Sequence, residues 1–350
     1  MMSLLRLLGA ALLGFASAVA AHASTPPAPS ASGAQDALVE QTLARLAVDS
    51  VRSATGNMDC LEPIEVTWPV GRRNWRGAVV DVEYTQRAGG YTSDYAIYRD
   101  SGRPFAEAAI EYLRRCRFEP SDSDQAGLRF RVVFQTVGGT TTRQTTELLN
   151  DLRHEAVNGS RGRKAMYAYT LELATAFDDV PRWAESTEWY LKAASEGNPR
   201  SMFEIGSRLL YGWRGFLRDR ELGVAWLQRS ADAAYGPAAW LLSQRIEPDP
   251  VTAKERLAQA AESGHPPAQL ALAEQLLAEG DDVRQAASWL RKARNAYDRL
   301  RWLEVAAKVE LARGRASRAA KHLSEGRELA VEAGYPLQVW DDLQALVDAA

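Results

Sequence analysis

Residues 219–236 read DRELGVAWLQRSADAAYG, and this stretch decides the fold because its pattern returns twice further along the chain. Asp219 opens it, and the bulky Trp226 follows seven positions later. The same spacing recurs from Asp249, 30 positions on, and from Asp282, a further 33 on. A period of about thirty residues predicts stacked units, because one unit cannot bury its apolar face alone.

Each of these aspartates stands where a helix needs an N-cap, and Pro250 after Asp249 suits the first helical position. Each capped helix runs to a pair of small residues, followed in most units by a glycine stop. The units are therefore predicted to be helix-turn-helix pairs. We expect residues 150–350 to form an all-α solenoid, with residues 339–347 as its C-terminal cap.

The best-formed unit resembles the Sel-one-like (Sel1-like) repeat, a relative of the tetratricopeptide repeat. The positions that carry the resemblance are Tyr211, Gly212, Gly215, Asp219, Trp226, Ser230 and Ala231. The resemblance implies a scaffold for protein complexes. Three tryptophans share the repeat phase, and packing between helices explains them better than a recognition stripe: Trp189, Trp226 and Trp289. Four other tryptophans do not share the repeat phase, so any of them could be exposed: Trp213, Trp240, Trp302 and Trp340.

The start of the chain predicts export. Arg6 precedes an apolar stretch over residues 7–20, which is shorter than the roughly 20 residues of a membrane span. Ala-His-Ala at 21–23 then gives a small-x-small cleavage site, so residues 1–23 are predicted to be a signal peptide and the protein periplasmic. An uncleaved anchor over residues 4–21 is the alternative. No later segment approaches membrane length.

Residues 24–56 are predicted to be a tether and a leading helix. The tract over 24–35 is rich in Pro, Ala and Ser and cannot bury a core. Apolar residues from Leu38 to Val51 then recur at roughly helical spacing, which predicts a helix leading into the next domain.

Residues 57–139 predict a small α+β domain with the order strand-strand-helix-strand. Apolar residues alternate over 78–84, 91–97 and 128–134, and they recur at spacings of three and four from Phe105 to Cys116. The sequence Ala-Gly-Gly at 88–90 predicts the hairpin turn.

This domain resembles the C-terminal domain of TonB-type proteins. The matching residues are Ser101-Gly102, Phe105, Ala108-Ala109 and Arg117-Phe118-Glu119-Pro120. The resemblance implies contact with an outer-membrane receptor or with peptidoglycan. Ala106 and Cys116 depart from the family's acidic residue and tryptophan, and the chain has a short signal in place of an anchor and a long arm. We therefore do not expect it to transmit proton-motive force.

Cys60 and Cys116 are the two cysteines, and both fall in the small domain. In an oxidising compartment such a pair is predicted to form a disulfide, which would contribute about 4 kcal/mol by loop entropy. Two free thiols or a redox pair are the alternatives.

Composition and motifs argue against several function classes. A formal charge of −3 from 42 basic and 45 acidic residues gives no strong field for nucleic acid. Three histidines remain after the signal, His154, His265 and His322, at no metal-ligand spacing, and no phosphate loop or nucleophile elbow occurs. The sequence predicts no enzyme, metal or cofactor.

We expect a periplasmic adaptor, in which the solenoid groove binds one envelope protein and the TonB-like domain docks a second partner. Predicted exposure makes Arg73, Trp75, Trp213 and Arg214 the candidate binding residues. The alternative is an envelope enzyme or inhibitor with a small-molecule or glycan site at the domain junction, near residues 137–152.

Overall fold

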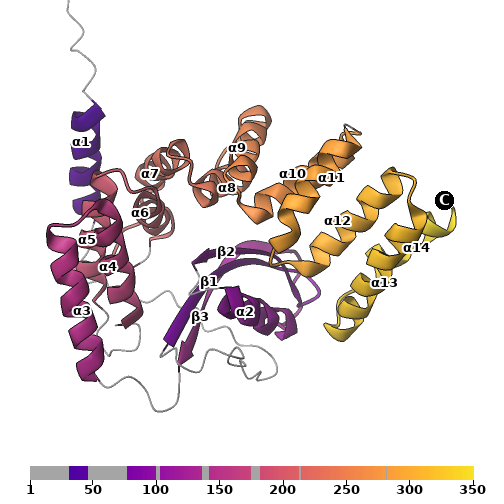
Figure 1. Ribbon diagram of the computed structural model, residues 1–350, viewed down its shortest axis with the longest axis horizontal. Helices are drawn as coiled ribbons and strands as arrows, with labels where there is room; N and C mark the ends of the chain where they lie inside the picture. The colour runs from indigo at the N-terminus through magenta and orange to yellow at the C-terminus, as the bar shows by residue number, and fades with distance from the viewer. Residues whose placement is uncertain are drawn as a thin grey trace, which may run out of the picture.

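A computed structural model of the chain describes residues 31–45, 77–99, 103–135, 142–174, 182–212, 214–280 and 282–350. A small three-stranded sheet with one helix is followed by a long run of helices (Figure 1). This confirms the predicted fold class, an α+β domain followed by an all-α solenoid. The predicted signal peptide over residues 1–23 lies outside the described residues.

The small domain consists of three antiparallel strands and one helix: β1 Gly77–Gln86, β2 Thr92–Arg99, α2 Arg103–Arg115 and β3 Gln125–Gln135. The sheet order is β2-β1-β3, with β1 in the centre. Gly90 lies in the predicted hairpin turn at φ +79°, and a Cβ there would stand 2.3 Å from the Phe118 carbonyl oxygen. Glycine is therefore required at this turn.

The core of the small domain forms between one face of β1 and helix α2. Val80 and Val82 on β1 are fully buried, as are Phe105 and Leu113 on α2. Cys116 follows α2 and is also fully buried. Cys60 lies outside the described residues, so the bridge between the two cysteines stays a prediction.

Twelve further helices and one short 3₁₀ helix follow within the described residues. They are α3 Thr142–Val157, α4 Arg161–Ala174, α5 Trp183–Ser195, α6 Pro199–Tyr211, α7 Arg220–Asp232, α8 Gly236–Arg245, α9 Pro250–Glu262, α10 Pro266–Ala278, α11 Val283–Lys292, η1 Ala293–Asn295, α12 Arg299–Ala312, α13 Ala316–Glu332 and α14 Gln338–Asp348. The long α13 and the final α14 form the C-terminal end of the run, where the sequence predicts a terminal cap.

The three repeated aspartates cap helices as predicted. The Asp219 carboxylate accepts from the Leu222 amide at 3.0 Å, the Asp249 carboxylate accepts from the Thr252 amide at 2.9 Å, and the Asp282 carboxylate accepts from the Arg284 amide at 2.8 Å. Each bond satisfies a backbone donor that the first helical turn leaves without an intrahelical partner. The repeat phase read from the sequence is therefore the phase of the helices.

The helix pairs pack closely through small residues. A Cβ added at Gly206 on α6 would stand 2.9 Å from the Gly223 carbonyl on α7, so these helices cross backbone to backbone. Trp226 is fully buried beside this crossing, as predicted for the in-phase tryptophans. Trp240 and Trp340 are only 7% and 5% exposed, so the exposure left open for them is ruled out. Alanine-rich neighbouring helices leave room that these large rings fill.

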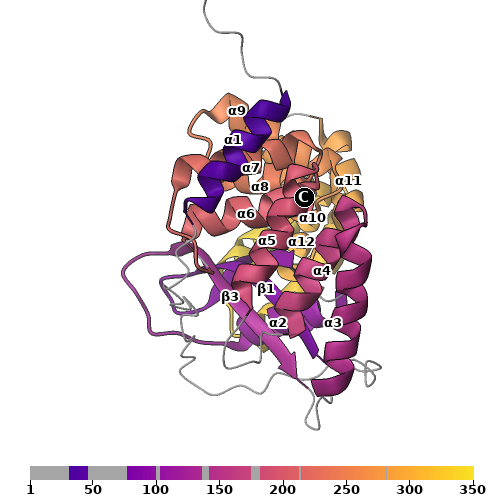
Figure 2. The same ribbon diagram turned by 90° about the vertical axis from the view of Figure 1, so that its left-hand side faces the viewer.

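Helix α1, Ala31–Leu43, includes residues that the sequence assigned to a tether. It does not lie on the small domain but across the outside of α5 and α7 (Figure 2). Trp226 Nε1 donates to Thr42 Oγ1 at 2.8 Å, and Gln35 Nε2 donates to the Ala194 carbonyl at 3.0 Å. These bonds to α5 and α7 hold α1 in place, although the composition of its first residues alone predicts no structure.

Helices α3 to α14 form an arc, and the small domain lies inside it (Figure 1). We call these helices the helical arc. Among the described residues, none of the helices is both long and apolar enough to cross a membrane.

Candidate functional site

The inner side of the helical arc contacts the small domain through side chains. The central strand β1 is covered on both faces: Val80 and Val82 pack on α2, while Asp81 and Glu83 point to the arc. We describe this interface as the candidate functional site, because it is where the solenoid binds a folded module.

Glu83 is held between two arginines and is 3% exposed. Arg129 on β3, directly opposite in the sheet register, places Nε 3.2 Å from Glu83 Oε2. Arg245, the last residue of α8, places Nε 3.3 Å from Oε1. The Arg129 guanidinium also lies 4.2 Å from the ring centre of Tyr211, at the end of α6. Glu83 and Arg129 together thus link the sheet to two helices of the arc, Glu83 to α8 through Arg245 and Arg129 to α6 through Tyr211.

A second group centres on Glu172 of α4, which is 2% exposed. Its carboxylate accepts from Arg208 Nη2 at 2.9 Å and also from Arg214 Nη1. Arg214 Nη2 lies 3.8 Å from Asp81 Oδ2 on β1. The Arg214 side chain is 11% exposed, so the exposure on which its selection rested is wrong. Its guanidinium lies between the arc and the sheet, where the chain's own carboxylates surround it.

A third group joins β2 to the end of the arc. The Tyr95 and Tyr335 hydroxyls lie 2.7 Å apart, and Tyr335 donates to the Thr92 carbonyl. The Tyr95 hydroxyl also lies 2.7 Å from Thr92 Oγ1. Burial raises the pKa of Tyr335 to about 12, and burial also raises the pKa of Tyr95 well above its ordinary value. Both phenols are therefore neutral at pH 7 and act as hydrogen-bonding groups.

Charged groups flank these tyrosines. Arg301 on α12 places Nη2 2.7 Å from Glu274 and Nη1 3.8 Å from Asp94 of β2. Asp298 caps α12 by accepting from the Arg301 amide at 3.1 Å. Burial raises the pKa of the Asp298 carboxyl, and the charges of Arg301 and Arg114 oppose that rise.

Individual side chains also make apolar contacts between the two parts. Ala96 on β2 joins the apolar core of the arc, and Tyr297 packs against the core of the small domain. An interface made mainly of ion pairs and hydroxyl bonds resembles a transient protein-protein interface more than a domain core. It orients the small domain without fusing the two cores.

Most of the binding residues predicted from the sequence lie outside the described part of the chain. Arg73, Trp75 and Trp213 lie outside the described residues, so their roles in binding stay predictions. Within the described part of the chain, no group of His, Cys, Asp and Glu side chains is arranged to hold a metal ion.

Glu83, Arg245 and Tyr335 were not predicted from the sequence. Alternation along β1 marked Glu83 as polar, and a polar strand face ordinarily contacts water. The available signal was the pair of carboxylates, Asp81 and Glu83, on one strand face. Nothing local indicated that their partners lie in the repeats.

The fold and the interface define a class of protein: a helical-repeat solenoid that carries a small α+β module on its inner side. No family model matches the sequence, and no curated protein matches it.

Several solved structures are similar. A Sel1 repeat protein from Oxalobacter formigenes shares 20% identity over 53% of this chain and 80% of its own, with a TM-score of 0.43. A protective antigen of uropathogenic Escherichia coli with an SLR fold, c5321, shares 21% over 60% of this chain and 53% of its own, at 0.38. The immunity protein Pa5087 from Pseudomonas aeruginosa shares 19% over 53% and 81%, at 0.33. The repeat architecture described above rests on this chain's own helices.

Proposed function

We propose that this protein is a non-enzymatic periplasmic adaptor whose helical arc and small domain present a joint binding surface. The observation that carries the proposal is the interface itself: the inner side of the arc already binds a folded module through Arg245, Arg214 and Tyr335. Repeat solenoids bind proteins through extended surfaces of this kind.

Because the small domain is docked on the inner side of the arc, the adaptor differs from the one expected from the sequence, in which that groove binds a partner. In the described residues the inner side of the arc contacts the small domain, so a separate partner does not enter an empty groove there. A partner instead contacts the rim, where helix ends and sheet meet, or the outer side of the arc. Because the interface is polar, a partner with matching charges can also compete with the small domain for the arc.

The small domain supplies the second contact. Among the described strands, β3 pairs with β1 alone, so its other edge can accept a partner strand. The resemblance to TonB-type domains motivates an outer-membrane receptor or peptidoglycan as the partner. Export by the predicted signal and a Cys60–Cys116 bridge fit the periplasm, where disulfides form.

The test is fractionation followed by capture. The full chain is expressed with its leader, and osmotic shock should release it with the periplasmic fraction, with both cysteines resistant to alkylation before reduction. The chain from residue 24 is then used to capture envelope proteins, beside an Arg245→Glu variant that weakens docking of the small domain. We expect one specific protein on the parent chain and a changed yield on the variant.

Retention in the cytoplasm would contradict the periplasmic assignment. Failure to retain any protein would contradict the adaptor, and binding of a glycan or small molecule in its place would favour the alternative of an envelope enzyme or inhibitor.

A further inference from the structure

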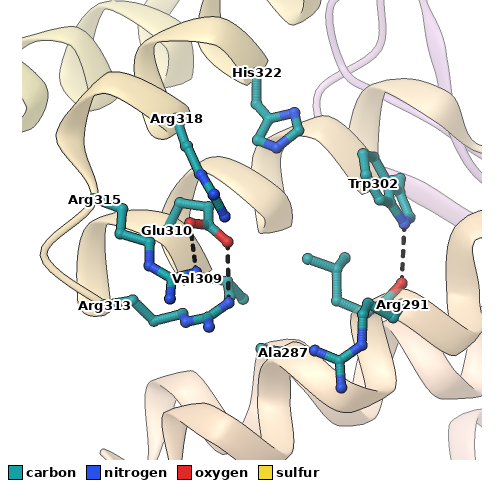
Figure 3. A pocket seen from close by; sticks show the side chains of 10 residues that line it. Ala287, Arg291, Trp302, Val309, Glu310, Arg313, Arg315, Arg318 and His322 are labelled. Carbon is teal, nitrogen blue, oxygen red and sulfur yellow. Dashed lines mark hydrogen bonds and ion pairs between the residues drawn. The ribbon is translucent and has the colours of Figure 1, made fainter.

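A cavity of about 330 Å³ lies between α11, α12 and α13 (Figure 3). Four arginines from these elements and the connections between them line it: Arg291, Arg313, Arg315 and Arg318. The volume is at the lower end of the roughly 300–1,000 Å³ found for ligand pockets. This cavity is separate from the interface with the small domain.

The cavity has an excess of positive charge. Glu310 is its one acidic lining residue, and it lies 3.2 Å from Arg313 Nη1 and 3.6 Å from Arg315 Nη1. Within the part of the chain that the structure describes, neither Arg291 nor Arg318 forms an ion pair. Two guanidinium groups thus line the cavity beyond the pair that Glu310 contacts.

The opposite wall is aromatic and fixed in position. Trp302 Nε1 donates to the Leu290 carbonyl at 3.2 Å, and its ring meets that of His322 edge to face at 5.6 Å. Figure 3 shows Trp302 on one side of the cavity and the arginines around Glu310 on the other. A ligand that carries an anionic group beside an apolar or aromatic group would meet both walls.

We propose that this cavity binds an acidic segment of a partner protein, with one carboxylate at Arg318, a second carboxylate at Arg291, which lies on the same side of the cavity as Trp302 in Figure 3, and an apolar side chain between them against Trp302. The inference rests on the proposed adaptor function and names the chemistry of its partner. Arg313 and Arg315 already bind a carboxylate in this cavity, that of Glu310. Guanidinium groups bind carboxylates through paired, charge-assisted hydrogen bonds, and an indole face supplies apolar area next to them.

A peptide-binding measurement tests the site. A fluorescein-labelled hexapeptide of alternating glutamate and phenylalanine is titrated with the chain from residue 24, and fluorescence anisotropy reports binding. We expect an Arg291→Gln/Arg318→Gln double variant to bind at least about tenfold more weakly, since it loses both guanidinium groups that would donate charge-assisted hydrogen bonds to the glutamates. Arg284→Gln, at an exposed position on α11 outside the cavity, is the matched control and should bind like the parent.

The inference would be overturned by no binding by the parent chain, by equal binding by the double variant, or by equal binding of a peptide with glutamine in place of glutamate. Displacement by inorganic phosphate at the affinity of the peptide would also overturn it, because the site would then be one for small anions. Since both arginines are exposed, the double variant should fold normally, which thermal unfolding checks. Rescue by Arg291→Lys/Arg318→Lys would support the role of charge.

Capture from envelope extract separates the two proposals. If the parent chain and the double variant retain the same partner equally, the cavity assignment fails while the adaptor stands. If the parent retains none, the adaptor fails whatever the peptide does.

Discussion

The interior of the helical arc and the interface between the arc and the small domain are built from different chemistry. The interior is apolar, with Ala239, Ala260 and Ala273 fully buried between helices. The interface depends on charged and hydroxyl pairs such as Glu83 with Arg245 and Tyr95 with Tyr335. Apolar burial is non-directional and collective, whereas a polar pair depends on two particular residues. A single polar change should therefore loosen the interface and leave the arc folded.

The largest effect is expected in the arc interior, from Trp226→Ala. The indole is fully buried and anchors α1 through Thr42, so the cavity left behind should lower the free energy of unfolding by about 3–5 kcal/mol. Urea unfolding followed by circular dichroism measures this loss. Hydrogen exchange should also show weaker protection of α1.

Trp226→Phe is the matched control, because it keeps one aromatic ring and loses the five-membered ring together with the bond to Thr42, so it should destabilise the chain less than Trp226→Ala. If both variants unfolded at the parent's urea midpoint, the arc would not depend on its apolar interior.

Acid should lower the stability of the arc interior through protonation of one buried histidine. His265 is buried beside Trp240, and burial lowers its pKa from 6.5 to about 3. The unfolded chain binds this proton more readily than the folded chain, so stability is present above about pH 6.5 and is lost as the pH falls toward 3. At about 1.4 kcal/mol for each pKa unit, the loss at pH 4.5 is about 2–3 kcal/mol.

His265→Gln should flatten this dependence, since glutamine has no proton to bind in this range. Urea unfolding at pH 7 and pH 4.5 compares the two chains. An equal drop in both would mean that acid acts elsewhere, and the buried histidine would not be the acid-sensitive point of the arc.

Glu83→Gln tests the interface. The variant removes the charge that attracts Arg129 and Arg245, and we expect docking of the small domain to weaken by about 2 kcal/mol, with Arg245 being 34% exposed and partly screened. Hydrogen exchange should rise in β1 and at the end of α8 while α9 to α11 keep their protection. Glu107→Gln, at a side chain 53% exposed on α2, is the control and should change neither region. Loss of protection throughout the arc would show that interface and interior are one cooperative unit.

The elements of the fold were predictable because their signals are local. Asp219, Asp249 and Asp282 mark helix starts by bonds that span three residues or fewer, and the alternation along β1 requires no knowledge of the rest of the chain. The helix at α2 followed from spacings of three and four. Each of these predictions rests on backbone geometry within one element.

The arrangement of those elements was not predictable by the same means. The bonds that place α1 and the small domain join residues 184, 162 and 240 positions apart, from Thr42 to Trp226, Glu83 to Arg245 and Tyr95 to Tyr335. Such contacts are set by tertiary packing, and a polar side chain reads the same in sequence whether it contacts water or a buried partner. For that reason Arg214 was expected to be exposed, whereas its side chain is only 11% exposed and lies between the carboxylates of Glu172 and Asp81.

The smallest expected effect separates helix stability from docking. Asp249 caps α9 from an exposed position, and its pKa is lowered by bonds from the Thr252 hydroxyl and amide. Asp249→Ala removes a helix N-cap and should lower the free energy of unfolding only slightly, with weaker exchange protection in the first turn of α9. Asp249→Asn keeps an acceptor and should recover most of the loss.

Because α9 is a helix of the arc and Asp249 takes no part in the interface, protection of β1 should stay at the parent's level in both variants. Faster exchange in β1 would mean that docking of the small domain depends on the stability of each helix in the arc. The interior and the interface would then not respond independently to mutation.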